Sequence, residues 1–120
     1  SCATLSIEPM IRGDWMCPGQ HLDLVGGFTP QMREADDIAI TKARVFIDTN
    51  DAVQTAGDIC DPLKRGVITD ADILGTLFTL TRGGEPAARP EGNEITLFKS
   101  AGSAIEDLAA AILAYEQVRG

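Results

Sequence analysis

The sequence predicts an α/β domain in which a mostly parallel sheet is flanked by helices and a long helix closes the chain. Short apolar runs alternate with segments of helical periodicity, which is the pattern of strand–helix–strand units. The chain has 120 residues, of which 44% are hydrophobic, and this length suits one compact domain rather than two. We therefore expect residues 1–120 to form a single domain.

The first half of the chain predicts two buried strands joined by a helix. Residues 1–9 are typical of a strand end that runs into a loop, and His21–Val25 is an apolar run stopped by Gly26-Gly27, as in a buried strand that ends at an open loop. The second strand is predicted at Arg44–Ile47. Between the strands, after Thr29-Pro30, apolar residues recur at helical spacing at Met32, Ala35, Ile38, Ala39 and Ala43.

The middle of the chain predicts two further helices. Residues 48–57 indicate a cap and a short helix that Gly57 ends in a left-handed conformation, followed by a loop over 58–65. Thr69 precedes Asp70 and Asp72, and a threonine cap with acids in the first turn favours a helix start. We expect that helix to run to Gly83-Gly84.

The last third of the chain predicts a loop, a strand and the closing helix. Residues 85–92 contain two prolines and a glycine and indicate a loop, and a third strand is predicted at Glu94–Phe98. Ser103 and Glu106 have the spacing of a capping box at the start of a helix that ends near Val118. A parallel sheet normally has more than three strands, and the sequence opens with Ser1 rather than methionine. We therefore expect a processed end or a cut inside a longer protein.

The charge balance excludes two classes of partner. Eighteen acidic residues outnumber ten basic ones, which gives a formal net charge of -8. Such a chain repels phosphate backbones and anionic lipid, so we expect neither nucleic acid nor a membrane surface as a partner. The longest apolar segment, residues 105–118, is too short to span a bilayer and carries three acidic residues.

The cysteines and the histidine predict neither a disulfide framework nor a metal site. Cys2, Cys17 and Cys60 are an odd number without a C-x-x-C pair, which fits reduced thiols and a cytoplasmic location. His21 is the only histidine, so ligand spacing typical of zinc is absent from the sequence.

Familiar catalytic motifs are also absent from the sequence. No G-x-G-x-x-G, P-loop or G-x-S-x-G occurs, and His21 has no convincing nucleophilic partner in Ser100, Ser103 or a cysteine. The acids near element ends are interpreted as caps or loop hydrogen-bond acceptors. They are Asp23, Asp48 and Asp58. The basic residues Lys64, Arg65 and Arg82 are expected to be solvated.

A series of landmarks nevertheless matches one protein family in order and spacing. The landmarks are Thr4–Pro9, Gly13–Trp15 with Pro18-Gly19, Leu24–Asp36, Ala43–Asp48, Ala56–Asp58 and Ile95–Ala111. Together they resemble the C-terminal part of the ornithine cyclodeaminase and mu-crystallin family, and the last stretch is the most specific. The resemblance runs from Ser1 to about Val118.

The resemblance implies a partial Rossmann-like fold. The chain would be the C-terminal half of the family's NAD(P)-binding domain, with the helix that leads back to the dimerisation domain. Members of the family are dimeric NAD(P)-dependent enzymes, of which some cyclise ornithine to proline and others reduce cyclic ketimines or imino acids. The resemblance therefore implies NAD or NADP as cofactor, a small imino or amino acid as substrate, and a homodimer.

The resemblance also implies roles for individual residues. Thr4 and Leu5 would touch the dinucleotide, Val25 would end a strand under the nicotinamide, and Ser100 would face both nicotinamide and substrate. Thr55 matches a position that approaches the ligand in mu-crystallin, although the residue type differs. The places of Thr4, Val25 and Gly26 agree with the rule that ligands of open parallel sheets lie beyond the carboxyl ends of the strands. The assignment of Ser100 rests on the resemblance alone.

Phe28 departs from the deaminase pattern. Ornithine cyclodeaminases have a catalytic aspartate at this position, and a phenyl ring can neither take a proton nor stabilise an iminium. The imino-acid reductases of the family also lack the aspartate, and hydride transfer to a C=N bond needs no base there. We therefore expect reduction of a cyclic ketimine or Δ1-pyrroline-2-carboxylate, with Phe28 either lining the substrate pocket or packing beneath its loop. No residue of this chain is assigned a catalytic role.

Two hypotheses about the isolated chain remain open. In the first, the 120 residues are part of such a reductase. They are then inactive alone and bind dinucleotide weakly or not at all, because the glycine-rich phosphate loop is missing. In the second, the chain is a truncated, non-enzymatic module that self-associates through an exposed sheet edge.

Overall fold

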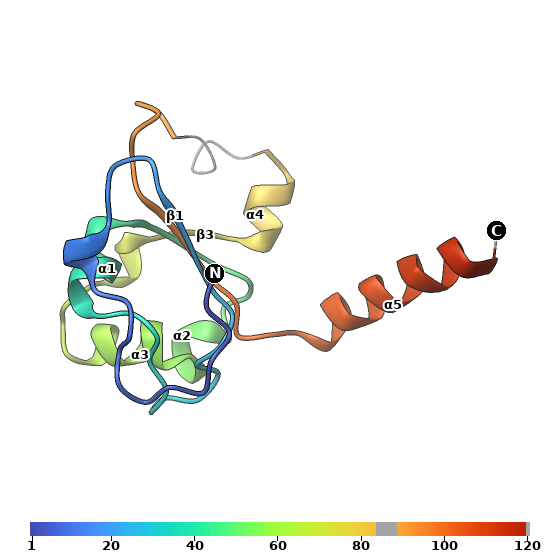
Figure 1. Ribbon diagram of the computed structural model, residues 1–120, viewed down its shortest axis with the longest axis horizontal. Coiled ribbons are helices and arrows are strands. Elements are labelled where there is room, and N and C mark those ends of the chain that lie inside the picture. The colour runs from blue at the N-terminus through green and yellow to red at the C-terminus, as the bar shows by residue number, and fades with distance from the viewer. Residues whose placement is uncertain (84–88, 120) are drawn as a thin grey trace.

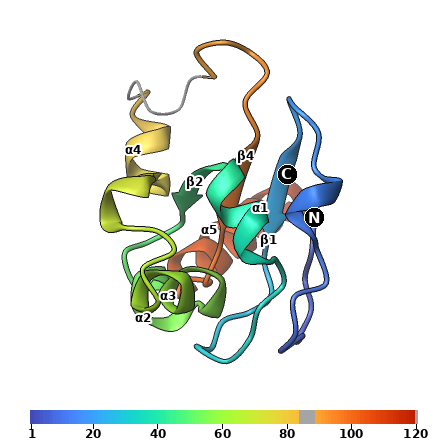
Figure 2. The ribbon, with the colours of Figure 1, turned by 90° about the vertical axis from the view of Figure 1, so that its left-hand side faces the viewer.

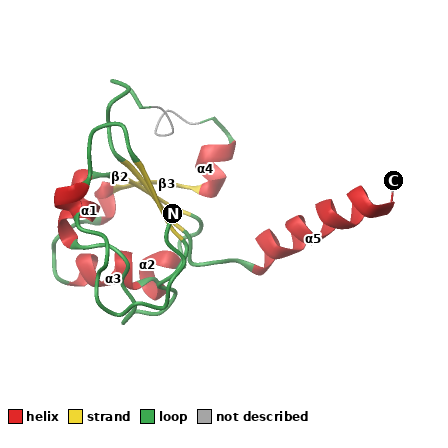
Figure 3. Cartoon of the chain, in the orientation of Figure 1, coloured by secondary structure: helices red, strands yellow, loops and turns green. Residues whose placement is uncertain are grey.

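The computed structural model describes residues 1–83 and 89–119, and within them four strands form one sheet in which all neighbours are parallel. The strands are β1 (His21–Leu24), β2 (Arg44–Ile47), β3 (Ile73–Thr76) and β4 (Thr96–Lys99). Their order across the sheet is β1-β4-β2-β3. The strands are drawn in yellow in Figure 3. This arrangement confirms the predicted α/β class, with one strand more than the sequence had indicated.

All strands of the sheet end along the same edge because they run parallel. Lys99, the last residue of β4, lies opposite Leu24 on one side and Ile47 on the other. An isolated parallel bridge between Cys2 and Leu24 places the N-terminal segment beside β1, as predicted for residues 1–9. We call the side where β1, β4, β2 and β3 end the carboxyl edge.

The hydrophobic core lies between the sheet and the helices on one side of it. The helices that contribute to this core are α1 (Asp37–Lys42), α2 (Ala52–Thr55) and α3 (Gly57–Lys64). In Figure 2, α1 lies in front of the sheet, and α2 and α3 lie toward the lower left. The buried core side chains from these elements include Leu22, Leu24, Ile40, Val45, Ile47, Ile59 and Leu97.

Helix α5 (Ala104–Arg119) extends away from the rest of the molecule (Figure 1). The backbone carbonyl of Ser103 accepts a hydrogen bond from the Glu106 N–H at 2.9 Å, so the helix begins where the sequence predicted. Its apolar side chains are exposed, namely Ile105, Leu108, Ile112, Leu113, Tyr115 and Val118.

The helix predicted after Thr29-Pro30 is wrong in its first half. Helix α1 begins only at Asp37, where the Asp36 carboxylate caps it by accepting from the Ala39 N–H at 2.8 Å. Residues 33–35 are not helical, and Ala35 instead forms an isolated parallel bridge with Ile11. Asp58 fixes this segment by accepting from the N–H groups of Glu34 and Ala35. A tertiary contact has overridden the local helical periodicity.

The loop predicted over 58–65 is also wrong, since residues 58–64 belong to helix α3 and Arg65 is its C-cap. Gly57 does not end a helix in a left-handed conformation but begins α3, with Ala56 as its extended N-cap. A Cβ at Gly57 would collide with the carbonyl oxygen of Met32 and lie 2.8 Å from that of Pro30. The glycine is therefore needed for close backbone approach rather than for a positive φ.

The long helix predicted from Thr69 to Gly83 is replaced by three short elements. A 3-10 turn, η2 (Asp70–Asp72), is capped as expected by Thr69 and leads into β3 and then α4 (Leu77–Thr81). Pairing with β2, in which Phe46 lies opposite Gly75, holds residues 73–76 as a strand. Gly83 then follows α4 with a φ of 71°. Residues 84–88, which include part of the predicted 85–92 loop, lie outside the described residues.

Arg65 is not simply solvated but joins an ion-pair network with Asp37, Asp61 and Arg33. Hydrogen bonds from Arg65 and then Arg33 lower the pKa of Asp37 from 3.8 to about 2. A carboxylate with a lowered folded-state pKa stabilises the fold above its unfolded pKa, and this contribution is lost as the pH falls.

We expect this network to make stability depend on pH between about 4 and 2. The Asp37 side chain is 36% exposed, so solvent screening limits its contribution to about 1 kcal/mol or less. Urea unfolding of the unmodified chain and of Asp37→Asn should differ most at pH 5 and converge toward pH 2. A difference that stays constant over this range would contradict the role of the Asp37 carboxylate.

Candidate functional site

Backbone hydrogen bonds bring three of the predicted site residues to the carboxyl edge. The Ser100 N–H donates to the Leu24 carbonyl at 3.0 Å, and the Val25 N–H donates to the Cys2 carbonyl at 2.7 Å. The Gly27 N–H donates to the Thr4 carbonyl at 3.3 Å. Thr4, Val25 and Ser100 therefore lie on adjacent segments beyond the strand ends, where open parallel sheets bind ligands.

Apolar side chains near this edge are exposed. Leu5 is 69% exposed, Val25 is 47% exposed and Phe28 is 51% exposed. Phe28 is therefore not buried beneath its own loop, which removes the second of the two interpretations offered for it. Side chains of this kind can contact a flat, weakly polar ring.

Thr55 is placed differently from the other predicted site residues. It is the last residue of α2, it is exposed, and its hydroxyl donates to the Asp51 carbonyl of its own helix at 2.9 Å. Within residues 1–83 and 89–119, no hydrogen bond joins the Thr55 side chain to Thr4, Val25 or Ser100. Its assignment to the substrate remains a prediction.

A cluster of three charged side chains, Lys99, Asp58 and Glu34, is fully buried behind the carboxyl edge. The Lys99 ammonium lies 3.6 Å from Asp58 Oδ2 and donates to the carbonyls of Leu24 and Gly26. Glu34 Oε1 accepts from the Thr4 N–H at 2.6 Å and from the Thr4 hydroxyl at 2.8 Å. We call these three residues the buried charge cluster.

Burial dominates the electrostatics of this cluster. It raises the pKa of Asp58 and lowers the pKa of Lys99, because each charged form loses water. The N–H groups of Ala35 and Glu34 and the charge of Lys99 oppose the shift of Asp58. Charges buried in this way are tolerated because they are paired and hydrogen-bonded.

Asp48 organises the segment that carries Ser100. This buried carboxylate follows β2, and its Oδ2 accepts from the N–H groups of Ala101 at 2.7 Å and Gly102 at 2.8 Å. The Ser100 hydroxyl lies 3.3 Å from the same oxygen and donates to it. The sequence-based interpretation of Asp48 and Asp58 as acceptors for loop N–H groups is confirmed.

Sequence reasoning missed Lys99 and Glu34 as parts of this region. Lys99 directly follows the predicted strand Glu94–Phe98 and in fact ends β4. The available signal was a lysine directly after an apolar run, because a lysine that is buried at a strand end needs a partner. Nothing in the spacing of Glu34 pointed to Thr4, since 30 residues separate them.

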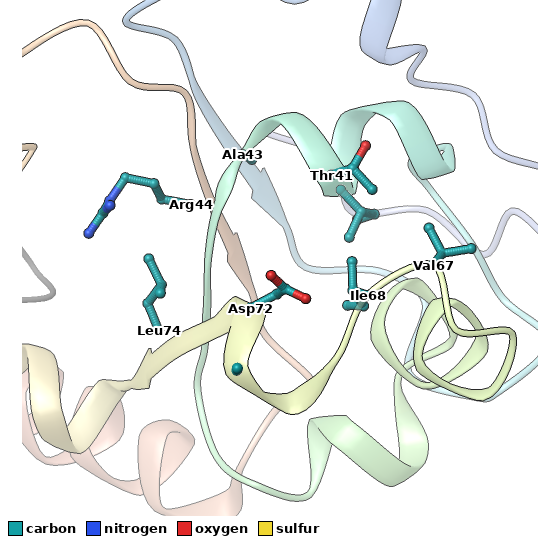
Figure 4. Close-up of a pocket in the computed structure, with 9 residues that line it drawn as sticks. Thr41, Ala43, Arg44, Val67, Ile68, Asp72 and Leu74 are labelled. Atoms are coloured by element: carbon teal, nitrogen blue, oxygen red, sulfur yellow. The ribbon is translucent and has the colours of Figure 1, made fainter.

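Two pockets lie near the sheet, at opposite ends of β2. One, of about 190 Å³, adjoins the carboxyl edge and is lined by Asp48, Thr49, Leu77, Phe78, Thr81, Ile105 and Glu106. The other, of about 220 Å³, lies beside the start of β2, where Arg44, Thr41, Ile68 and Leu74 line it (Figure 4). Only the first is on the side where parallel sheets bind ligands.

The residues at the carboxyl edge fit half of a dinucleotide. Exposed Leu5 and Val25, with the hydroxyls of Thr4 and Ser100, suit a nicotinamide and its ribose. The 120-residue sequence has no glycine-rich loop for the pyrophosphate. Within the described ranges, no group of three or more His, Cys, Asp or Glu side chains is placed to hold a metal ion.

A comparison with known protein families assigns the chain to one of them. The model of the ornithine cyclodeaminase/mu-crystallin family matches residues 1–120. The chain belongs to the ornithine cyclodeaminase/mu-crystallin family. This confirms the resemblance inferred from the landmark residues.

Individual relatives within this family include named reductases. The chain is 40% identical to Δ1-pyrroline-2-carboxylate reductase of Paracoccus denitrificans, over 90% of this chain and 34% of that protein. It is 35% identical to the ketimine reductase mu-crystallin of mouse, over 94% of this chain and 33% of that protein.

A solved structure of similar fold contains a bound cofactor. Thermococcus litoralis Δ1-pyrroline-2-carboxylate reductase, in complex with NADH and L-proline, aligns with a TM-score of 0.84 and 38% identity. The alignment covers 95% of this chain and 35% of that one. The chain thus spans about a third of the length of these family members.

Among the residues that the structure describes, no helix combines the length and the apolar character needed to cross a membrane.

Proposed function

We propose that this chain contributes the nicotinamide-facing part of the dinucleotide site of an NAD(P)-dependent reductase of cyclic imino acids. The observation that carries the proposal is the meeting of Thr4, Val25 and Ser100 at the carboxyl edge through backbone hydrogen bonds. The family supplies the class of cofactor, since the similar Thermococcus litoralis structure is a complex with NADH.

Phe28 favours reduction over deamination. Its exposed phenyl ring stands where the deaminases of this family have a proton-accepting carboxylate, and it offers no such group. The relatives described above are named as Δ1-pyrroline-2-carboxylate and ketimine reductases. The proposed substrate is therefore a cyclic ketimine or Δ1-pyrroline-2-carboxylate.

Each residue at the edge has a simple physical task in this proposal. Leu5 and Val25 exclude water from one face of the cofactor ring, while the Ser100 hydroxyl, held by Asp48, orients ring and substrate. Phe28 provides an apolar wall on the substrate side. When bound, the nicotinamide supplies the hydride for the C=N bond.

We also propose a place for this chain in the domain arrangement of such a reductase. Residues 1–120 would act as the C-terminal half of a Rossmann domain, with α5 leading to the region that makes a homodimer. The exposed apolar side chains of α5 support this, because large apolar side chains gathered on one element commonly mark an interface.

NMR titration of the folded 120-residue chain with NADH and NADPH tests the site. We expect weak, saturable shifts confined to the amides of Thr4, Leu5, Val25 and Ser100, and no turnover of cyclic imino acids. Val25→Asp should abolish the shifts, whereas Val118→Asp, on exposed α5, should leave them unchanged. Shifts centred on the pocket beside Arg44, or turnover of cyclic imino acids by the chain alone, would contradict the proposal.

The alternative function is a self-associating, non-enzymatic module. The apolar surface of α5 and the exposed sheet edge at β3 favour association. Light scattering over a range of concentrations distinguishes the self-associating module from the reductase part, since the module must dimerise without any nucleotide. A monomer at high concentration, together with NADH-dependent shifts at the carboxyl edge, would exclude it.

A further inference from the structure

Lys99 occupies an unusual position for a lysine, because its whole side chain is buried at the end of a central strand. Its ammonium donates to the carbonyl of Leu24, at 3.3 Å, and to that of Gly26. These two carbonyls belong to the residues on either side of Val25. The Lys99 ammonium therefore binds the backbone both before and after Val25, the residue that faces the proposed cofactor.

Within residues 1–83 and 89–119, the segment 25–27 has no ladder partner on the side of β4. Strand pairing between β1 and β4 ends with Leu24 opposite Lys99. On the other side, the N–H groups of Val25 and Gly27 donate to the carbonyls of Cys2 and Thr4. Residues 2–4 thus hydrogen-bond to segment 25–27 on one side. On the other side, the buried partner of segment 25–27 is the Lys99 ammonium.

The counterion of Lys99 is itself fixed. Asp58 Oδ1 accepts from the N–H groups of Glu34 at 2.8 Å and Ala35 at 3.0 Å, so the carboxylate cannot rotate away freely. Through its side chain, Glu34 then holds Thr4. The same buried charge cluster therefore ties the Thr4 segment and the Val25 segment together.

We propose that Lys99 is a positioning residue that fixes the Val25–Gly27 backbone at the carboxyl edge. Its ammonium acts as a substitute for the missing strand partner and keeps Val25 at a constant distance from Ser100, the residue that directly follows β4. That this spacing serves a nicotinamide rests on the proposed function. A bound ammonium can do this where an apolar side chain cannot, because it satisfies two buried carbonyls at once.

Amide hydrogen exchange in Lys99→Met tests the proposal on the chain as it exists. Methionine keeps most of the side-chain length but removes both charge and donors. We expect the Val25 and Gly27 amides to exchange at least about tenfold faster relative to those of Arg44 and Cys60, which lie outside the segment. Lys64→Met, a substitution of the exposed lysine at the end of α3, should change none of these rates.

A double variant separates hydrogen bonding from charge balance. In Lys99→Met/Asp58→Asn no carboxylate at position 58 is left without a counterion. The asparagine oxygen can still accept hydrogen bonds from the N–H groups of Glu34 and Ala35. We expect stability to recover in part while the Val25 and Gly27 amides remain fast. Recovery of slow exchange in the double variant, or equal acceleration of all amides in Lys99→Met, would overturn the proposal.

A measurement on the unmodified chain decides the matter if the variants do not fold. The ammonium hydrogens of Lys99 should exchange slowly with water and show cross-relaxation to the Hα atoms of Gly26. A rapidly exchanging ammonium without that contact would overturn the proposal. NADH titration of the same sample keeps the two proposals apart, because NADH-induced shifts centred away from the carboxyl edge count against the proposed function and leave the exchange result for Lys99 intact.

Discussion

Asp58→Ala should unfold the chain or leave it with little remaining stability. The change strands the buried ammonium of Lys99, and an unpaired buried charge costs about 3–5 kcal/mol. It also removes the acceptor of the Glu34 and Ala35 N–H groups, at about 1–3 kcal/mol each when buried. Small domains have only about 5–15 kcal/mol in total. Chemical denaturation followed by circular dichroism measures the loss.

Asp61→Ala is the matched control for this prediction. Asp61 lies on the same helix, three residues further on, and pairs with Arg33 and Arg65 at the partly exposed ion-pair network. Such pairs contribute about 1 kcal/mol or less. If Asp58→Ala proved as mild as Asp61→Ala, the buried charge cluster would not support the fold in the way its geometry indicates.

Gly26→Ala should disrupt both the fold and the candidate site. A Cβ at this position would collide with the Thr4 carbonyl and with Glu34 Oε1, and would lie 2.5 Å from the Thr4 nitrogen. Relief requires the N-terminal segment to move away from β1, which breaks the Thr4–Glu34 hydrogen bonds. We expect a loss of about 3 kcal/mol or more, well above the roughly 0.4–1 kcal/mol that alanine gains by restricting the unfolded chain.

Gly66→Ala separates steric collision from backbone strain. Gly66 has a φ of 71°, and a Cβ there would meet no atom within 4 Å. Alanine in this left-handed conformation costs roughly 1–2 kcal/mol without disturbing neighbours. Urea unfolding should therefore rank Gly26→Ala well below Gly66→Ala in stability, and NMR shifts of Thr4 and Glu34 should change only in the former. The reverse ranking would show that the carboxyl edge tolerates a side chain at Gly26.

The strands were predictable where local signals and tertiary pairing agree. Arg44–Ile47 has the predicted bounds, and His21–Val25 and Glu94–Phe98 are displaced by at most two residues. Strand β3 was missed because Leu74 and Leu77 lie at helical spacing, and only pairing with β2 selects the extended form. Helix α3 was missed because Gly57 and Pro62 are strong loop signals when their packing is not known.

The candidate site was predictable from family landmarks, but its support was not. The places of Thr4 and Val25 agree with strand ends in a parallel sheet, whereas that of Ser100 came from the family resemblance alone. The cluster of Lys99, Asp58 and Glu34 depends on contacts across 24 or more residues, which periodicity does not encode. Local spacing therefore locates the edge where ligands bind, while the charges that hold that edge emerge only from the folded chain.

The central place of β4 has a consequence for folding during synthesis. Strands β1 and β2 do not pair with each other, because β4, the last strand along the described chain, lies between them. A growing chain that has reached only residue 83 therefore has no continuous sheet and leaves apolar strand edges exposed to chaperones. Pairing of residues 96–99 closes the sheet and, in the same step, places Lys99 and Ser100 beside β1. Completion of the sheet and assembly of the carboxyl edge are thus a single event in folding.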